Sequence, residues 1–598
     1  MKIEQGAKLH EYSFVCINFQ ILLTALNSKY IHTNLAVRYL HQFAAQRGYD
    51  CEIAEYTINQ HLPDILDEIY RQQPDVLLLS CYIWNIEMML DLAEEYRRIC
   101  PDVTILAGGP EVSYNSEQLL REQPAFDAVL CGEGEAPFLE YLQFLSGART
   151  IHEVHSLVWK DASGQIVRNP TAEVLDMAQL PFPYPDLEQL SDRILYFESI
   201  RGCPFRCSYC LSSVAGRVRY LPLDLCFERL QRFLVAKVRQ VKFVDRTFNC
   251  SKEHTMAIWR YLAEHDNGIT NFHFELTAHL IDQEMIDFLK TVRKGLFQFE
   301  IGVQSTNPDT IREIRRTTDT ERLLAICREL DRPKNIHLHL DLIAGLPYED
   351  FNSFGRSFDT VMQIRPQQMQ LGFLKVLKGS YMAQAAQEYG LAYSRKAPFQ
   401  VVRTRWISYA ELLRLKDMEA AVEDYYNSGL FPNQISWMLD QEESAFSFFL
   451  DFGRYRVEQG LHLIPQNLED RCTTLKDYYF ARHPERLSQL ALLHDLCLFD
   501  LCCHTKPKKL PDWVSGEQNL AYREQIRSFY RDEELMQRLF PSCQGMDSKQ
   551  LSKTSHLQIF SFDPVTHATG PVALLFDYHD RDLLGSARRI DVSSLILA

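Results

Sequence analysis

Three cysteines on one short segment constrain this chain more than any other feature. Cys203, Cys207 and Cys210 have the spacing Cys-x3-Cys-x2-Cys. Three thiolates on one loop can hold three irons of a [4Fe–4S] cluster, which leaves the fourth iron open to a small molecule. A structural zinc ion is the alternative, but it normally takes four ligands, and Cys226 and Cys250 stand singly downstream. The spacing therefore favours an iron–sulfur centre.

The composition is that of a globular chain with several domains. At roughly 100–200 residues per domain, 598 residues predict three or four domains. The net charge is −16, and we expect no bulk nucleic-acid binding because such binding depends on neutralising phosphates. No apolar run reaches the roughly 18–20 residues of a membrane span, and the first residues lack a signal-peptide pattern. We therefore expect a cytoplasmic protein whose 16 cysteines are mostly reduced.

Short apolar runs alternate with helical patterns in front of the cysteine loop. Because these runs show no polar alternation, they indicate strands covered on both faces, and we predict a doubly wound parallel sheet of the Rossmann-like, flavodoxin-like kind. Such sheets bind ligands beyond the carboxyl ends of their strands. The expected strands are residues 14–17, 51–55, 75–80, 103–107 and 128–130, and the expected helices include 35–45 and 86–98.

Small residues gather at three of these strand ends. Ser80 ends one strand, Gly108 and Gly109 end another, and the run Gly132-Glu133-Gly134-Glu135 follows a third. Small residues at these positions would let a large flat ligand reach the backbone. The same glycines would also suit tight turns alone, and the residues by themselves leave both interpretations open.

The cysteine loop, residues 201–210 (RGCPFRCSYC), is similar to the signature of the radical S-adenosylmethionine (SAM) superfamily. The resemblance implies that the amine and carboxylate of SAM bind the open iron. It further implies that one electron cleaves the sulfonium and that the resulting 5′-deoxyadenosyl radical takes hydrogen from the substrate. Tyr209 would occupy the aromatic position beside the adenine, or else pack under the loop.

The first region resembles the cobalamin-binding domain that precedes many radical SAM enzymes, through Ser80, Gly108, Gly109 and the Gly-Glu-Gly-Glu run. Members that ligate cobalt with a protein side chain carry Asp-x-His-x-x-Gly after the first strand. His32 in this chain lacks both the aspartate and the glycine. We therefore expect cobalamin to be held without a histidine below the metal.

A radical SAM signature should be followed by a partial (β/α)6 barrel of the TIM type, and the chain supplies six candidate strands. Functional residues in such barrels lie where strands end and loops begin. Helical patterns separate the strands, for example residues 225–238 and 281–293. The expected strands are residues 194–199, 241–244, 272–276, 297–303, 337–343 and 369–376.

Polar residues at these strand ends suit SAM, whose ammonium needs a carboxylate and whose carboxylate needs a guanidinium. These segments resemble the coproporphyrinogen dehydrogenase branch and the cobalamin-dependent members of the superfamily. By that likeness Glu275 and Arg316 would hold the methionyl end, Gln304 and Asp341 would hold the ribose, and Gly345 would let the adenine approach the backbone. The roles of three further residues remain open. Arg315 could replace Arg316, Asp245 could face the substrate, and Glu300 could be structural.

We expect four segments along the chain. They are a cobalamin-binding-type domain at 1–150, a proline-dense linker at 151–190, the radical SAM barrel at 191–395 and a C-terminal accessory domain at 396–598. The last is expected to be mostly helical with a hairpin at 557–562 and 572–576, and the aromatic run at 446–450 should be core. Cys497, Cys502 and Cys503 are poorly spaced for a second cluster.

The sequence thus predicts a radical SAM enzyme with a [4Fe–4S] cluster, SAM and cobalamin that transfers a methyl group to an unactivated carbon. The alternatives are an oxidative or rearrangement enzyme without cobalamin and a cobalamin- or redox-sensing protein. Methylthiolation of tRNA is disfavoured, since Cys16, Cys51 and Cys81 stand in apolar strands rather than in a second cluster motif. We expect a small-molecule or peptide substrate and an electron donor such as flavodoxin or ferredoxin.

Overall fold

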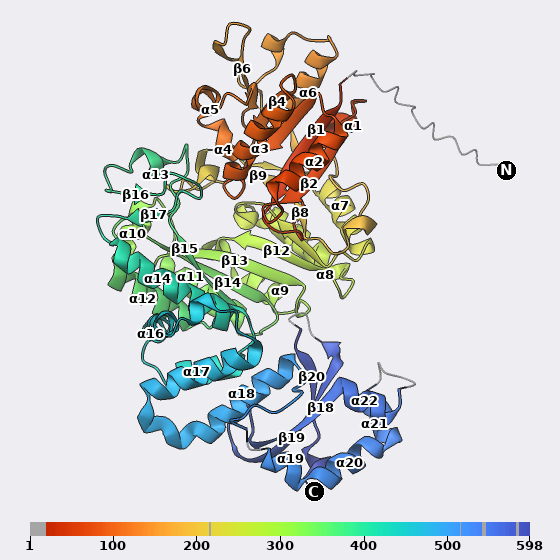
Figure 1. Ribbon diagram of the computed structural model, residues 1–598, viewed down its shortest axis with the longest axis vertical. Coiled ribbons are helices and arrows are strands. Elements are labelled where there is room, and N and C mark those ends of the chain that lie inside the picture. Colours follow the sequence, from red (N-terminus) through yellow and green to blue (C-terminus); the bar gives the residue numbers. More distant parts are fainter. Residues whose placement is uncertain (1–18, 215–216, 515, 541–545, 582–584, 598) are drawn as a thin grey trace, which may run out of the picture. The chain divides into compact units, whose positions relative to one another are not determined.

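The computed structural model describes residues 19–214, 217–514, 516–540, 546–581 and 585–597 (Figure 1). The chain divides into two compact units. The first comprises Met1–Leu338, Gly345–Glu349 and Phe373–Ser408, and the second comprises His339–Ala344, Asp350–Gly372 and Tyr409–Ala598. No helix in the described part of the chain is long and apolar enough to cross a membrane.

The first unit begins with a seven-stranded sheet in the order β2-β1-β3-β4-β5-β6-β7. Strands β1 to β5 are parallel and follow the 2-1-3-4-5 order of flavodoxin-like sheets. The last two strands are antiparallel additions. The strands are β1 (Ile21–Asn27), β2 (Glu52–Thr57), β3 (Val76–Ser80), β4 (Thr104–Gly108), β5 (Ala128–Leu130), β6 (Leu157–Lys160) and β7 (Ile166–Arg168).

One expectation for this region needs correction, and another falls outside the described residues. The first strand is β1, whereas the expected strand at 14–17 lies outside the described residues. The segment 151–190, expected as a linker, contains β6 and β7, which pair as a hairpin and complete the sheet. Asp161 makes the turn between them by accepting hydrogen bonds from the Ser163 and Gln165 backbone N–H groups at 2.8 and 2.9 Å.

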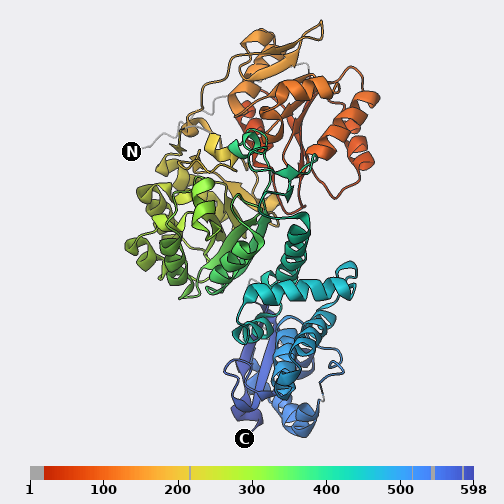
Figure 2. The ribbon, with the colours of Figure 1, turned by 90° about the vertical axis from the view of Figure 1, so that its left-hand side faces the viewer.

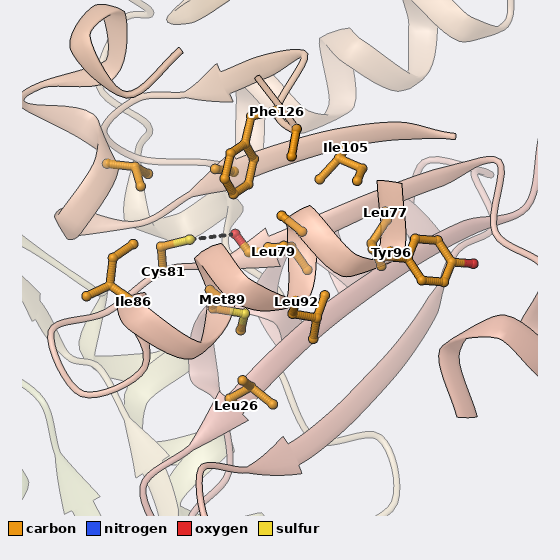
Figure 3. Close-up of a cluster of buried hydrophobic side chains, with 14 of the residues drawn as sticks. Leu26, Leu77, Leu79, Cys81, Ile86, Met89, Leu92, Tyr96, Ile105 and Phe126 are labelled. Atoms are coloured by element: carbon orange, nitrogen blue, oxygen red, sulfur yellow. Dashed lines mark hydrogen bonds between the residues drawn. The ribbon is translucent and has the colours of Figure 1, made fainter. Parts of the chain in front are cut away.

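Helices cover both faces of this sheet, as the unbroken apolar strands predict. Because side chains alternate along a strand, Leu77 and Leu79 of β3 enter one buried cluster, while Val76 and Leu78 enter the other. Figure 3 shows the first cluster, in which Met89 of α3 packs over the sheet. The helices are α1 (Leu35–Ala45), α2 (Leu62–Gln72), α3 (Ile86–Ile99), α4 (Pro110–Ser113), α5 (Ser116–Glu122) and α6 (Glu135–Leu145).

A second run of parallel strands follows in the same unit. Strands β8, β11, β12 and β13 pair in parallel with their chain neighbours. Helices alternate with them, and β14 and β15 continue the alternation along the chain, so all six expected strands are present and the α/β class is confirmed. The elements are β8 (Leu195–Phe197), α7 (Leu223–Val235), β11 (Gln240–Phe243), α8 (Lys252–Glu264), β12 (Asn271–Leu276), α9 (Gln283–Leu289), β13 (Phe297–Gln304), α10 (Pro308–Glu313), α11 (Thr320–Asp331), β14 (His337–Ala344), α12 (Phe351–Met362) and β15 (Gln368–Phe373).

Most of the second unit is helical. Its aromatic run is core as expected, with Phe448 and Phe449 fully buried, and Asp359 of α12 caps α16 by accepting a hydrogen bond from the Phe446 N–H at 2.8 Å. Figure 2 shows the teal and blue helices of this unit beside its blue strands. The larger helices are α14 (Tyr409–Ala421), α15 (Pro432–Asp440), α16 (Ala445–Glu458), α17 (Leu468–Arg482), α18 (Leu490–His504) and α20 (Arg523–Arg531).

The expected C-terminal hairpin is a three-stranded antiparallel sheet in the order β18-β19-β20. It consists of β18 (Ser555–Phe562), β19 (Thr569–Arg581) and β20 (Ala587–Asp591). Cys497, Cys502 and Cys503 lie buried on α18, and the Cys497 thiol donates a hydrogen bond to Gln434 Oε1 at 3.1 Å.

Candidate functional site

The three motif cysteines lie on the excursion between two short paired strands, β9 (Ile200–Arg201) and β10 (Arg219–Tyr220). None of the three is in a disulfide, and all three are half-buried. Burial raises the pKa of the Cys207 thiol, and the neighbouring Cys210 and Cys203 raise it further. The Cys207 thiol thus lies within electrostatic reach of the other two. This all-thiol set of three fits a [4Fe–4S] cluster with one open iron.

A buried carboxyl fixes the backbone just before this excursion. Asp245 accepts hydrogen bonds from the Ser199 N–H at 2.8 Å, the Ile200 N–H at 2.9 Å and the Ser199 hydroxyl at 2.5 Å. Its side chain is fully buried, which raises the pKa of Asp245 to about 8. The hypothesis that Asp245 faces the substrate is therefore wrong, because both carboxyl oxygens point toward β8 and β9.

Two arginines at the base of the excursion are held by two glutamates from the N-terminal sheet. Arg201 Nη2 lies 2.5 Å from Glu135 Oε1, and Arg201 Nη1 lies 3.3 Å from Glu133 Oε2. Arg219 also pairs with Glu133, and Arg201 Nε pairs with Glu198 at 2.9 Å. Arg201 and Arg219 are direct cross-strand neighbours in β9 and β10. We call Glu133, Glu135, Arg201 and Arg219 the arginine–glutamate clamp.

The clamp borders a cavity of about 830 Å³. Its lining includes Ser80, Gly108 and Gly109 from the strand ends of the N-terminal sheet, as well as Gly202 beside the first cysteine. Gly109 has a φ of +107°, and a Cβ there would lie 2.5 Å from the Cys81 carbonyl oxygen, so glycine is required for the two loops to meet. A Cβ at Gly132 would meet no atom within 4 Å, because this glycine borders open space.

Aromatic side chains give the cavity a flat wall. Tyr82 and Trp84 stack with ring centroids 4.4 Å apart and planes 12° apart, and both line the cavity. The Trp84 indole N–H donates to the Leu26 carbonyl at 3.1 Å, which fixes the pair to the end of β1. His32 also lines the cavity, but its Nδ1 lies 2.7 Å from the Tyr196 hydroxyl, and burial lowers its pKa.

Gln304 and Arg316 come together beside the cysteine loop. Arg316 donates hydrogen bonds to the Tyr209 hydroxyl at 3.1 Å and to the Gly302 carbonyl at 2.9 Å. Gln304 has a φ of +71°, an unusual backbone conformation for this residue type, and its side chain folds over Gly302. Among the described residues, nothing bonds Gln304 Oε1 or Arg316 Nε, although both atoms are buried. This pair therefore has polar capacity left for a ligand.

The other candidates at the strand ends occupy different surroundings. Glu275 Oε1 of β12 lies 3.9 Å from Arg246 Nη1, and Asp341 of β14 pairs with His339 at 2.8 Å. Gly345 has a φ of +87° and adjoins Val401. Two further residues are placed as follows: Glu300 pairs with His273 at 3.1 Å, and the Arg315 guanidinium lies over the Tyr381 ring at 3.5 Å. Arg316, not Arg315, thus reaches the cysteine loop.

Several contacts of the site escaped sequence reasoning. They are the ion pairs of the clamp, the stacking of Tyr82 on Trp84 and the exposure of Arg246 to the cavity. Arg201 stands directly before the Gly-Cys of the motif, and Glu133 and Glu135 flank Gly134 in a run already singled out, so their charges were the available signal. Nothing local indicates that these residues pair, because 66 or more positions separate the partners.

Comparison with known proteins assigns three segments. The B12 binding domain family matches residues 21–142, the Radical SAM superfamily matches residues 197–361, and a protein family of unknown function (DUF4080) matches residues 387–575. The cobalamin-dependent radical SAM methyltransferase TokK of Streptomyces tokunonensis is 26% identical over 316 residues, which are 49% of this chain and 45% of TokK. The chain thus spans less than half the length of that relative.

Two solved structures share the fold. The radical enzyme OxsB, with aqua-cobalamin and SAM bound, superimposes with a TM-score of 0.58 at 13% identity, over 81% of this chain and 84% of OxsB. The methyltransferase TsrM of Kitasatospora setae, with cobalamin and a [4Fe–4S] cluster bound, has a TM-score of 0.53 at 17% identity, over 63% of this chain and 76% of TsrM. The chain therefore joins a B12-binding domain, a radical SAM domain and a DUF4080 domain, in that order.

Proposed function

We propose that this chain is a radical SAM enzyme that binds a [4Fe–4S] cluster, SAM and cobalamin, and that it methylates an unactivated carbon of a small molecule or peptide. The observation that carries the proposal is the shared cavity, which is lined both by the strand-end loops of the B12-binding domain and by Gly202, Leu211 and Ser212 around the cysteines. Two relatives of this chain are methyltransferases by name.

The residues present fit the three groups. Three thiols on one short excursion between β9 and β10 suit a cluster with an open iron. The unbonded Arg316 Nε suits the methionyl carboxylate of SAM, and the unbonded Gln304 Oε1 suits its ribose. The glycine-edged cavity with its Tyr82–Trp84 wall suits a flat corrin ring. When bound, the cluster supplies the electron that cleaves SAM, and cobalamin supplies the methyl group.

The chain's own residues position these groups and exclude water. Arg316 would hold the methionyl carboxylate of SAM, and the Tyr209 hydroxyl, which accepts a hydrogen bond from Arg316, keeps the guanidinium in place beside the cysteine loop. Thr247 Oγ1 lies 3.4 Å from Cys203 Sγ and orients that thiol. Tyr82 and Trp84 cover one wall of the cavity with apolar rings, which excludes water from the cavity that the proposed chemistry uses.

Two further features of the proposal concern the protein's surroundings. We place the enzyme in the cytoplasm, since none of its described cysteines is in a disulfide, as expected in a reducing compartment. An electron donor of the flavodoxin or ferredoxin type would reduce the cluster.

The test uses the full chain, purified and reconstituted without oxygen. With dithionite and SAM, the wild type should release 5′-deoxyadenosine, measured by mass spectrometry, and Cys203→Ala should not. Cys250→Ala is the matched control, because Cys250 lies outside the motif and contacts the Tyr220 hydroxyl instead. The visible spectrum of protein loaded with hydroxocobalamin reports corrin binding.

The outcomes separate the alternatives. Deoxyadenosine without a corrin band would indicate radical SAM chemistry that does not use cobalamin. A corrin band without SAM cleavage by a loaded cluster would favour a sensor. A wild type that holds no [4Fe–4S] cluster would refute the proposal.

A further inference from the structure

Arg246 is the exposed arginine of the cavity next to the cysteine loop. Arg246 follows β11 and lines the cavity, and 60% of its side chain is exposed there. Its direction follows from its neighbours, because Asp245 is anchored inward by Ser199 and Ile200, and Thr247 contacts Cys203.

The cavity's other arginine has no capacity left for a ligand. Arg201 lines the same cavity, but its guanidinium is already paired with Glu133, Glu135 and Glu198. His32 offers little positive charge, because burial lowers its pKa. Among the described lining residues, Arg246 is therefore the cation that presents its charge to the cavity.

The charge of Arg246 is retained at this position. Partial loss of hydration lowers the pKa of the guanidinium, but Glu275, Cys210, Tyr82 and Glu198 together raise it by more, so the pKa ends above its ordinary value. The pair with Glu275 is long, since 3.9 Å exceeds a hydrogen bond. A bidentate anion at normal distance would bind the planar guanidinium more strongly than this pair does.

We propose that Arg246 binds an anionic oxygen group of the substrate, a carboxylate or a phosphate, and so selects acidic substrates. This inference rests on the proposed function, because it places the substrate in the same cavity. Glu275 is the residue expected to hold the ammonium of SAM. SAM bound to that carboxylate would free the Arg246 guanidinium from Glu275. The anionic group of the substrate would then supply the negative charge that pairs with Arg246.

The experiment measures binding of inorganic phosphate and of acetate to the cluster-loaded, SAM-bound full chain by titration calorimetry. Arg246→Gln should raise the Kd of the preferred anion about tenfold or more, as expected for the loss of a hydrogen bond to a charged group. Arg246→Lys keeps the positive charge but lacks the planar guanidinium, so its Kd for that anion should lie between the values for the wild type and Arg246→Gln. Phosphate and acetate together distinguish a phosphate-bearing from a carboxylate-bearing substrate.

Arg312→Gln is the matched control, since it removes the same charge from α10, where Arg312 is 76% exposed and pairs with Asp309. Its anion Kd should change less than about twofold. Three results would overturn the inference: equal anion Kd values for the two glutamine variants, no anion binding by the wild type at tens of millimolar, or a roughly tenfold weaker SAM Kd in Arg246→Gln, which would assign the arginine to SAM. Deoxyadenosine release by the wild type is scored separately and tests the proposed function alone.

Discussion

The arginine–glutamate clamp makes the order of the cysteine loop depend on residues of the other domain. Glu135 and Arg201 are nearly buried, with side-chain exposures of 6% and 12%. Glu135→Gln keeps the size of the side chain but removes its charge and one of its two acceptor oxygens. We expect this variant to loosen the loop that carries Cys203, Cys207 and Cys210.

The size of the effect follows from what remains around Arg201. Breaking a buried pair completely costs about 3–5 kcal/mol, whereas loss of one hydrogen bond to a charged group costs about 1.5–3 kcal/mol. Because Glu133 and Glu198 still neutralise Arg201, the lower range applies, and we expect Glu135→Gln to destabilise the closed loop by about 2 kcal/mol. At 1.4 kcal/mol per factor of ten, the loop should open about 30-fold more often.

Hydrogen–deuterium exchange of the backbone amides at residues 203–212 measures this opening directly. Iron content after gel filtration gives a second readout, and the variant should retain less iron than the wild type. Glu117→Gln is the control, because Glu117 is 42% exposed and its pairs with Arg121 and Arg168 lie at the surface. Equal exchange at residues 203–212 in both variants would show that the clamp does not hold the loop.

Three further variants probe other parts of the structure. Gly109→Ala should destabilise the first sheet by about 3 kcal/mol or more in urea unfolding, because its φ is +107° and the new Cβ would meet the Cys81 carbonyl; an unchanged midpoint would contradict this. Gly302→Ala should weaken SAM binding about tenfold in equilibrium dialysis with stability nearly unchanged, because its Cβ would displace only the flexible end of Gln304; unaltered SAM affinity would count against a role for Gln304. Burial raises the pKa of Asp495 to about 6, so its contribution to stability is full below about pH 4 and is lost as the pH rises to about 6; Asp495→Asn should flatten this dependence in urea unfolding, and parallel pH profiles would refute the assignment.

The sequence predicted the helices and strands whose ends are set by residues close by in the chain. Helix α1 begins and ends at the expected residues, because Asn34 caps it by accepting from the Val37 N–H and because its apolar residues recur at helical spacing. Strand β1 was not predicted, since another apolar run precedes it in the sequence. The choice of Ile21–Asn27 depends on pairing with β2 and β3, which are distant in sequence.

In the site, too, features set by nearby residues were predicted and features set by distant residues were not. The cysteines were found because their spacing is local, and Arg316 was singled out by resemblance. The direction of Asp245 was not predictable, because an acid after a strand can turn either way and Ser199, 46 positions earlier, decides it. The hairpin β6–β7 was missed for another reason: its strands have only four and three residues, and the proline-dense stretch that follows suggested a linker.

The clamp also has a consequence for the order of biosynthesis. Glu133 and Glu135 precede their arginines in the chain. Glu133 lies in the loop between β5 and α6, and Glu135 is the first residue of α6. Since ribosomes release the N-terminal domain first, these carboxylates are in place before Arg201 and Arg219 emerge. The nascent cysteine loop is thus anchored at its base as it appears, and its thiols are presented together to the machinery that delivers iron and sulfide. A permuted gene that encodes residues 19–150 last would remove this advantage and should yield chains poor in iron.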